Sequence, residues 1–166
     1  LAFVAMEPPD SLAAEDVRDR KAELLEAVRP LSTDDVVRGQ YTSGVVEWRE
    51  VRGYRDEERV ARESTVETFV ALRAWIDNER WKDVPFFLRT GKRLPTRASE
   101  ITIQLKDVPP ILFNRDADRR LNANALRIRI QPDEGFSLCI SSKVPGPRVG
   151  IRPVAMDFDY EEFFKM

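Results

Sequence analysis

Residues 126–141 read LRIRIQPDEGFSLCIS, and they contain the clearest structural pattern in the chain. Apolar and polar side chains alternate from Leu126 to Gln131, and the alternation resumes from Phe136 to Ser141. A period of two is typical of strands with one apolar and one polar face, as in antiparallel sheets. The Pro-Asp-Glu-Gly sequence between the two runs has the composition of a tight turn. The stretch therefore predicts a β-hairpin.

The same alternation recurs in residues 36–41, 66–76 and 101–106, so strands are predicted for much of the chain. A period of 3.6 residues predicts a helix over residues 12–29, which Ser11 or Asp10 can cap. Lys21 lies on the apolar stripe of this helix, either with its stem along the surface or with its charge turned inward to a partner. The predicted fold class is α+β, a mostly antiparallel sheet with few helices packed on one face.

Three segments follow neither period. Residues 49–64 are dense in Arg and Glu, which predicts an exposed excursion. Residues 107–124 contain two adjacent prolines and mixed charges, and residues 144–153 contain three prolines. We expect irregular structure in both of these segments.

The composition limits the possible functions. The chain has 166 residues, of which 42% are hydrophobic and 34% charged, which fits one folded domain. Its net charge is −2 and its basic residues are scattered, so nucleic acid is not an expected partner. No apolar run approaches the ~20 residues of a membrane helix, and the opening apolar segment is too short for a signal peptide. The single cysteine, Cys139, fits a reducing compartment. We therefore expect a cytoplasmic protein with no membrane partner.

The chain contains no histidine, which is the commonest general base near neutral pH and the commonest metal ligand. A Ser-His or Cys-His pair is therefore impossible. The seven glycines never form the G-x-G-x-x-G pattern that binds a dinucleotide. The sequence predicts no catalytic residue, no cofactor-binding residue and no metal ligand in this chain.

A second informative stretch, VPFFLRTGKRLPTR, occupies residues 84–97. An apolar strand ends there at Gly91, and the cations Lys92 and Arg97 follow it. Glycine allows a close turn, and a lysine point charge together with the planar fork of an arginine suits a phosphate group. The competing interpretation is that both cations are solvated surface charges.

Several blocks of the chain resemble, in the same order, the carboxy-terminal sugar-phosphate-binding domain of the glucose-6-phosphate dehydrogenase family. Residues 84–97 are similar to the substrate loop of that family in its bacterial form. The other blocks are Met6-Glu7-Pro8-Pro9, Asp16–Lys21, Val36–Tyr41, Gly53-Tyr54, Ser64–Phe69, Asp77–Trp81, Arg129–Glu134 and Met156-Asp157-Phe158.

The resemblance implies an NADP-dependent oxidation of glucose 6-phosphate to 6-phosphogluconolactone in the oxidative pentose phosphate pathway. It implies that residues 1–166 are part of the carboxy-terminal domain, that the dinucleotide-binding domain is absent, and that NADP is bound mainly by that absent domain. The catalytic histidine of the family would lie just before Leu1, and the family's closing elements would follow Met166. The chain alone is therefore expected to be inactive.

The same resemblance assigns the binding of glucose 6-phosphate to Lys92, Arg97 and Gln131. Arg129 is similar to an arginine that in mammalian members helps to hold a second, structural NADP, but other features of that site are missing here. We therefore expect no structural NADP in this chain. Family members usually pair through this sheet, which implies a homo-oligomer whose contact is the polar sheet face that includes Arg127.

Two other functions remain open. One is a non-catalytic sheet module for binding phosphorylated metabolites or for subunit assembly, and the other is an unrelated antiparallel domain that binds phosphorylated metabolites. The dehydrogenase interpretation is favoured over both because Lys92 and Arg97 are both present, which a pure scaffold would not need.

Individual side chains also have alternatives. Glu67 and Asp77 could form a carboxylate pair or separate ion pairs, and Arg127 and Arg129 could bind an anion or pair with acids across the sheet. Aromatic side chains that could either line a pocket or pack in the core are Trp75, Trp81 and Phe86. Cys139, on a polar strand face among serines, is expected to be a surface or interface thiol.

Overall fold

The computed structural model describes residues 1–46, 48–107, 124–147 and 150–164. The chain divides into two compact units, Leu1–Pro95 and Thr96–Met166. None of the described helices has the length and apolarity needed to cross a membrane.

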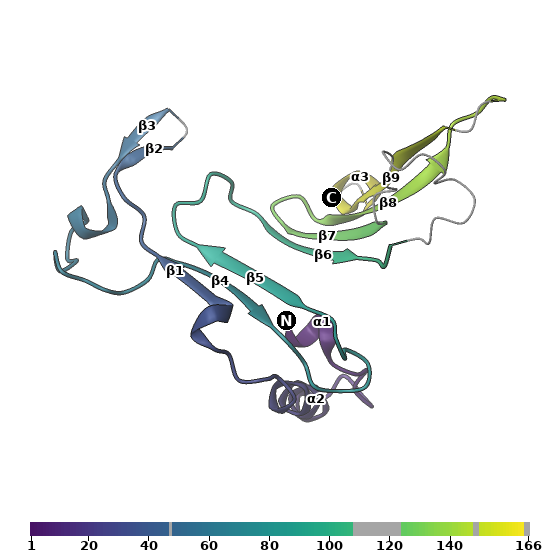
Figure 1. Ribbon diagram of the computed structural model, residues 1–166, viewed down its shortest axis with the longest axis horizontal. Coiled ribbons are helices and arrows are strands. Elements are labelled where there is room, and N and C mark those ends of the chain that lie inside the picture. Colours follow the sequence, from purple (N-terminus) through teal and green to yellow (C-terminus); the bar gives the residue numbers. More distant parts are fainter. Residues whose placement is uncertain (47, 108–123, 148–149, 165–166) are drawn as a thin grey trace. The chain divides into compact units, whose positions relative to one another are not determined.

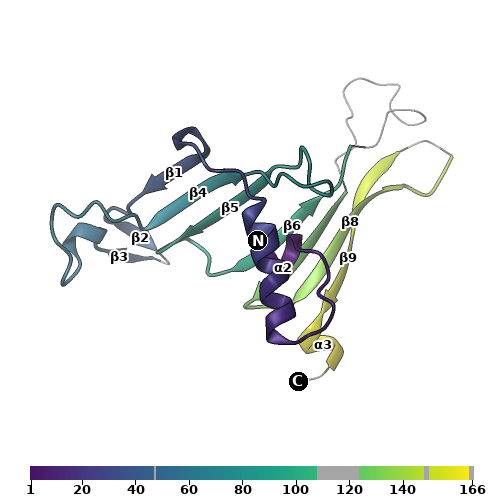
Figure 2. The same cartoon turned by 90° about the horizontal axis from the view of Figure 1, so that it is seen from below.

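The first unit is built around a three-stranded antiparallel sheet in the order β1-β4-β5, with β4 in the middle (Figures 1 and 2). Strands β2 and β3 pair with each other in a separate two-stranded sheet. The elements are α1 (Ala2–Ala5), α2 (Ala14–Glu26), the 3-10 helix η1 (Thr33–Asp35), β1 (Val36–Gly39), β2 (Gly44–Val46), β3 (Arg49–Val51), the 3-10 helix η2 (Tyr54–Asp56), β4 (Phe69–Ala74) and β5 (Phe86–Gly91).

The second unit is an antiparallel meander in the order β6-β7-β8-β9 (Figure 1). Its elements are β6 (Ser99–Gln104), β7 (Ala125–Gln131), β8 (Gly135–Lys143), β9 (Ile151–Asp159) and α3 (Tyr160–Phe164). The predicted hairpin is confirmed, because β7 pairs with β8 and Leu126 lies opposite Leu138. The α+β class is also confirmed, with the described strands divided among three antiparallel sheets.

A small apolar core holds the first unit together. Ala5 of α1, Leu24 of α2 and Ile76 are buried against one another, and Trp81 and Phe86 pack on them. The Trp81 indole Nε1 donates a hydrogen bond to the Ala5 carbonyl at 2.7 Å, and its ring meets the Phe86 ring edge-on at 5.1 Å between centroids. The core-packing interpretation of these two aromatic residues is therefore confirmed.

Helix α2 is shorter than the predicted 12–29. Its N-cap is Ala13, so neither predicted cap occupies that position. Ser11 instead accepts a hydrogen bond from the Ala13 amide at 3.0 Å and donates one to the Asp16 carboxylate, which satisfies polar groups just before the helix. After Glu26 the chain pairs with the residues that follow β4, because the Arg29 amide donates to the Trp75 carbonyl at 2.9 Å.

The Lys21 ammonium lies over the Phe3 ring, 4.7 Å from its centroid. Phe3 is itself 72% exposed, so this contact lies at the surface and does not turn the Lys21 charge inward.

Two further predicted boundaries are wrong. The strand predicted over 66–76 is reduced to β4, and Ile76 forms only an isolated bridge with Val28. The loop predicted over 144–153 ends early, because β9 begins at Ile151 and includes Pro153. A proline is tolerated there because β9 is an edge strand of its sheet, where an amide can go without a partner. The exposed excursion predicted over 49–64 is confirmed, since most of its residues are exposed, and it contains β3 and η2. Residues 108–123 of the second irregular segment lie outside the described residues.

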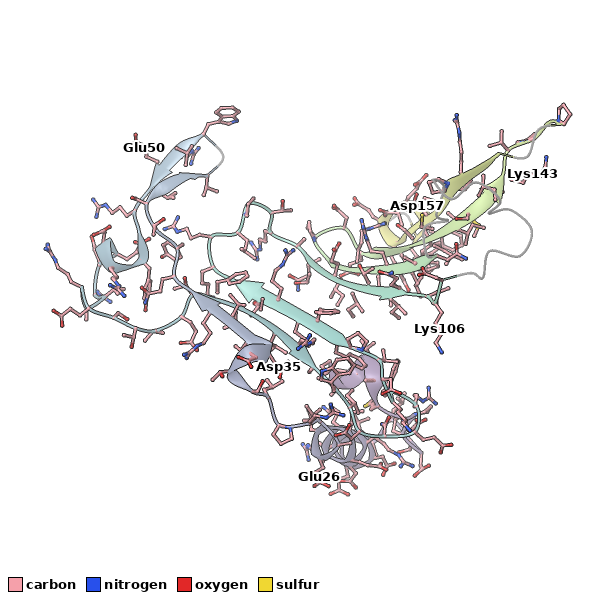
Figure 3. All side chains as sticks on the ribbon, viewed as in Figure 1. Glu26, Asp35, Glu50, Lys106, Lys143 and Asp157 are labelled. Carbon is pink, nitrogen blue, oxygen red and sulfur yellow. The ribbon has the colours of Figure 1, made fainter. Side chains whose placement is uncertain are left out.

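Arg129 ties three strands of the second unit together. Its Nε donates to the Asp133 carbonyl at 3.1 Å, Nη1 to the Ser137 hydroxyl at 2.8 Å, and Nη2 to the Phe158 carbonyl at 3.3 Å. Asp157 of β9, labelled in Figure 3, lies 3.8 Å from Nη1. Arg129 therefore pairs with acids across the sheet, as one of its two alternatives predicted. Arg127 approaches Glu100 more loosely, at 3.9 Å.

Gly135 provides the room for this arginine. A Cβ at this buried position would overlap the Phe158 carbonyl oxygen and lie 2.5 Å from Arg129 Nη2. The absence of a side chain at position 135 is therefore a condition for the Arg129 network.

Gly135→Ala should lower the free energy of unfolding of the purified protein by about 1–3 kcal/mol, because overpacking must displace either backbone or guanidinium. Urea denaturation followed by circular dichroism measures the change. Gly44→Ala is the matched control, since a Cβ on that strand glycine meets nothing within 4 Å. Equal effects of the two substitutions would contradict this account of Gly135.

Candidate functional site

The candidate site lies at one end of the β1-β4-β5 sheet (Figure 1). The register aligns Gly39, Phe69 and Gly91 across the three strands. Beyond that line, the Thr68 amide donates to the Gly39 carbonyl at 2.9 Å, and the Lys92 amide donates to the Thr68 carbonyl at 2.8 Å. These bonds continue the sheet past Gly91, so the Lys92 backbone is fixed where β5 ends.

Gly91 is the last residue of β5, as the sequence predicted. A Cβ there would lie 2.9 Å from Cδ2 of the Phe69 ring and 3.4 Å from the Leu94 side chain. The glycine therefore allows Leu94 and the Phe69 ring to approach the strand end closely. The Leu94 side chain therefore lies against the end of β5, two residues after Lys92.

The two cations after Gly91 have different surroundings. Lys92 is exposed, and within the described part of the chain its ammonium forms no ion pair. Arg93 is bound: its Nη2 lies 2.7 Å from Glu57 Oε1, and its guanidinium carbon lies 5.7 Å from the Tyr41 ring centroid. The hydrogen bond with Glu57 and the neighbouring Tyr41 raise the pKa of Arg93 above its ordinary value. Of these two cations, Lys92 is therefore the one that is available to bind an anion.

Residues next to this sheet end are also hydrogen-bonded. The Gln40 amide nitrogen donates to the carbonyls of Ser64 and Val66 at 2.8 Å each. The Gln40 side-chain oxygen accepts a bond from Arg55 Nε at 2.9 Å. The Tyr41 amide donates to Thr68 Oγ1 at 3.0 Å. The excursion that follows β3 is thus attached to the end of the sheet from which Lys92 emerges.

Two shallow depressions lie along the same excursion. One, of about 280 Å³, is lined by Arg38, Gly39, Gln40, Arg55, Thr65 and Glu67. The other, of about 700 Å³, is lined by Ser43, Glu50, Val51, Arg52, Arg55, Asp56, Glu57, Val60 and Arg62. Their linings mix cations and carboxylates and do not include Lys92, so we do not assign the phosphate site to either.

Arg97 and Gln131 belong to the second unit. Ser99, the first residue of β6, pairs with Gln131 at the end of β7, and Arg97 is two residues before Ser99. Both side chains are therefore carried at the same end of the β6-β7 pair, and both residues are exposed. Lys92 belongs to the first unit, and its convergence with Arg97 on one anion stays a prediction.

Other candidate groups have structural partners or lie apart. Asp77 forms a two-bond contact with Arg29, at 2.6 and 3.1 Å, which lowers the pKa of the Asp77 carboxyl. Glu67 precedes β4 and Asp77 follows it, so they do not form a carboxylate pair. Arg29 and Arg73 each lie 6.0 Å from the Trp75 ring centroid.

Within residues 1–46, 48–107, 124–147 and 150–164, no three His, Cys, Asp or Glu side chains are grouped as metal ligands. Cys139 is a half-buried free thiol.

An exposed lysine fixed at a strand end of an antiparallel α+β domain defines a candidate anion-binding domain. Residues 1–166 match the family model described as "Glucose-6-phosphate dehydrogenase, C-terminal domain", and the chain belongs to that family.

Named relatives agree with this family. The chain is 45% identical over 166 residues to glucose-6-phosphate 1-dehydrogenase of Chlamydia muridarum, covering 99% of this chain and 33% of the relative. It is 42% identical over 162 residues to the enzyme of Bacillus subtilis, covering 95% of this chain and 33% of the relative. The chain thus spans about a third of the length of these relatives.

Two solved structures are also similar. The glucose-6-phosphate 1-dehydrogenase of Mycobacterium avium has a TM-score of 0.79 and 41% identity, over 96% of this chain and 32% of that one. A glucose-6-phosphate dehydrogenase in complex with its substrate glucose-6-phosphate has a TM-score of 0.86 and 36% identity, over 99% of this chain and 32% of that one.

Proposed function

We propose that this chain supplies the substrate-binding portion of a cytoplasmic, NADP-dependent glucose-6-phosphate dehydrogenase. The whole enzyme would oxidise glucose 6-phosphate to 6-phosphogluconolactone in the oxidative pentose phosphate pathway. Family membership and the names of the relatives support this proposal. The observation that carries it is Lys92, an exposed cation held by a backbone hydrogen bond at a glycine-ended strand.

We infer that Lys92, Arg97 and Gln131 bind the sugar phosphate. Lys92 offers a point charge, Arg97 offers two parallel N–H donors, and Gln131 offers an amide that can donate to a phosphate oxygen. Pro95 restricts the backbone between the two cations, which reduces the entropy lost when the ligand binds.

The chemistry itself needs groups that these 166 residues do not offer. In the whole enzyme, NADP held outside these residues would supply the acceptor for the hydride from C1 of the sugar. This chain has neither a histidine to act as the base nor a glycine-rich dinucleotide loop. The Arg129 guanidinium, which could have held a second NADP, is committed to Ser137 and to backbone carbonyls.

We therefore propose that residues 1–166 form part of the carboxy-terminal domain and that NADP binds mainly to a separate amino-terminal domain. The part played by this chain is to hold the sugar by its phosphate and so to orient C1.

The purified 166-residue polypeptide should show no dehydrogenase activity, because general base catalysis alone commonly contributes ~10²–10⁴-fold. NADPH formation from glucose 6-phosphate, followed by absorbance, tests this directly. Activity that co-purifies with the polypeptide would refute the division of labour proposed above.

In the full-length enzyme, Lys92→Ala should weaken binding of the sugar phosphate by about 1.5–3 kcal/mol, or roughly ten- to hundredfold in KM for the sugar. The KM for the nucleotide should change little. Lys82→Ala is the control, because Lys82 is also an exposed lysine of the same unit but precedes β5 instead of following it. If both variants keep the wild-type sugar KM, Lys92 is only a surface charge.

We further propose that the enzyme is a homo-oligomer that pairs through the polar face of the β6–β9 sheet. Arg127, Arg129, Ser137 and Cys139 lie on that face, because the register places Arg127 opposite Ser137 and strand residues alternate between faces. A broad sheet face with an ion-pair network offers self-complementary contacts in a two-fold arrangement.

Arg127→Glu should shift the full-length enzyme toward monomer in light scattering at micromolar concentration. Arg127 is exposed and only loosely paired, so the substitution should leave the fold intact. Arg152→Glu is the control, because Arg152 pairs with Ser142 and so lies on the opposite face of the same sheet. A wild-type enzyme that is monomeric under these conditions would rule out the proposed contact.

A further inference from the structure

Arg93, the residue after Lys92, has an unusual backbone conformation. Its φ is 55°, in the left-handed region that side chains other than glycine and asparagine seldom occupy. Such a conformation persists only where the surrounding structure holds it. Because Arg93 directly follows Lys92, whatever holds Arg93 also fixes the path of the chain that carries the Lys92 side chain.

Three groups form a closed set around Arg93. Its Nη2 lies 2.7 Å from Glu57 Oε1, and its guanidinium lies over the Tyr41 ring at 5.7 Å. The Tyr41 hydroxyl donates to the same Glu57 oxygen at 3.3 Å. Each member therefore contacts the other two, and we call Tyr41, Glu57 and Arg93 the Arg93 clamp.

The three members come from three separate segments. Tyr41 follows β1, Glu57 follows η2, and Arg93 follows β5. The Glu57 segment is itself attached to the sheet end. The Tyr54 amide donates to the Tyr41 carbonyl at 3.0 Å, and the two tyrosine rings meet edge-on at 5.8 Å between centroids.

The contribution of the Arg93 clamp to the stability of the fold does not explain its presence. The side chains of Arg93 and Glu57 are 42% and 29% exposed, and ion pairs this accessible to solvent add little to the stability of a fold. What the clamp does fix is geometry, since it restrains a strained residue one position beyond the proposed phosphate-binding lysine. Restraint of a binding loop before the ligand arrives increases affinity by reducing the cost of ordering it.

We propose that Glu57 and Tyr41 are positioning residues for the sugar phosphate: they hold Arg93, and through it they keep the Gly91–Pro95 loop in the conformation that presents Lys92. The inference rests on the proposed function of Lys92. Arg93 itself is then a structural cation and not a phosphate ligand, because Glu57 and the Tyr41 ring occupy its guanidinium.

The test measures kcat and the KM values for glucose 6-phosphate and NADP in the full-length enzyme. Glu57→Gln removes the charge and keeps the shape of the side chain. Arg93→Asn removes the guanidinium while keeping a residue that tolerates positive φ. If each variant leaves between about a third and a tenth of the loops competent, the sugar KM rises about three- to tenfold. The nucleotide KM should not change.

The double variant Glu57→Gln with Arg93→Asn should have the same sugar KM as Arg93→Asn alone, because Arg93→Asn already removes the contact that Glu57→Gln weakens. Tyr41→Phe removes only the hydroxyl and should raise the sugar KM by less. It also provides the readout if Glu57→Gln fails to fold. Asp35→Asn is the matched control: it breaks the Arg73–Asp35 pair, which has side chains 48% and 18% exposed, at the start of β1.

Lys92→Ala, measured in parallel, separates the two levels of the argument. If Lys92→Ala leaves the sugar KM unchanged, the proposed function of the loop fails. If Lys92→Ala raises it while the clamp variants match Asp35→Asn, only the positioning role fails. If the effects of Glu57→Gln and Arg93→Asn multiply in the double variant, Arg93 contacts the phosphate itself and the clamp is overturned.

Discussion

The hydrogen bond from the Lys92 amide to the Thr68 carbonyl, 2.8 Å long, fixes where β5 ends and the proposed substrate loop begins. It extends the line of cross-strand contacts through Gly39, Phe69 and Gly91 by one residue. Because β4 is the central strand, a shift of Thr68 would move both of its neighbours. The position of the candidate lysine is therefore set by the register of the whole sheet, and not by the loop alone.

Register also explains the glycine before the lysine. Phe69 lies directly opposite Gly91, and its ring occupies the space that a Cβ at position 91 would need. At this sheet end, a glycine at position 91 lets the turn close without displacing the Phe69 ring. The Thr-Gly-Lys order at residues 90–92 is thus a packing requirement of the sheet as well as a possible requirement of the ligand.

Much of the fold was predictable because it depends on local patterns. The period-two runs located β1, β6, β7 and β8, and the Pro-Asp-Glu-Gly turn located the β7–β8 hairpin. The wrong predictions have two causes, long-range strand pairing and a local side-chain contact. A proline normally ends a strand, and only the edge position of β9 makes Pro153 acceptable, which no pattern within residues 144–153 indicates. The N-cap was misplaced by two residues because Ser11 bonds to Asp16 instead of beginning the helix.

The candidate site was likewise predictable where it depends on neighbouring residues in the sequence, and not where it depends on distant ones. Gly91 and Lys92 are adjacent in the sequence, and their order alone indicated a strand end that carries a charge. Arg93 and Glu57 are 36 residues apart, within segments whose charges look like those of any solvated surface. A left-handed φ at an arginine leaves no signature in the sequence, so only the fold could connect the Glu57 segment to the loop.

Arg129 and Arg93 show that the role of an arginine depends on its hydrogen-bond and ion-pair partners in the structure. Both could have been assigned to an anion from the sequence, and both are already engaged. Arg129 uses Nε and both Nη nitrogens within its own sheet, in a space that Gly135 keeps open. An incoming phosphate would have to break those bonds and compete with Asp157 and Asp159, which lie 3.8 Å from the guanidinium. Lys92 has no acid paired with it among the described residues, and this difference in local charge makes it the better candidate for the proposed phosphate contact.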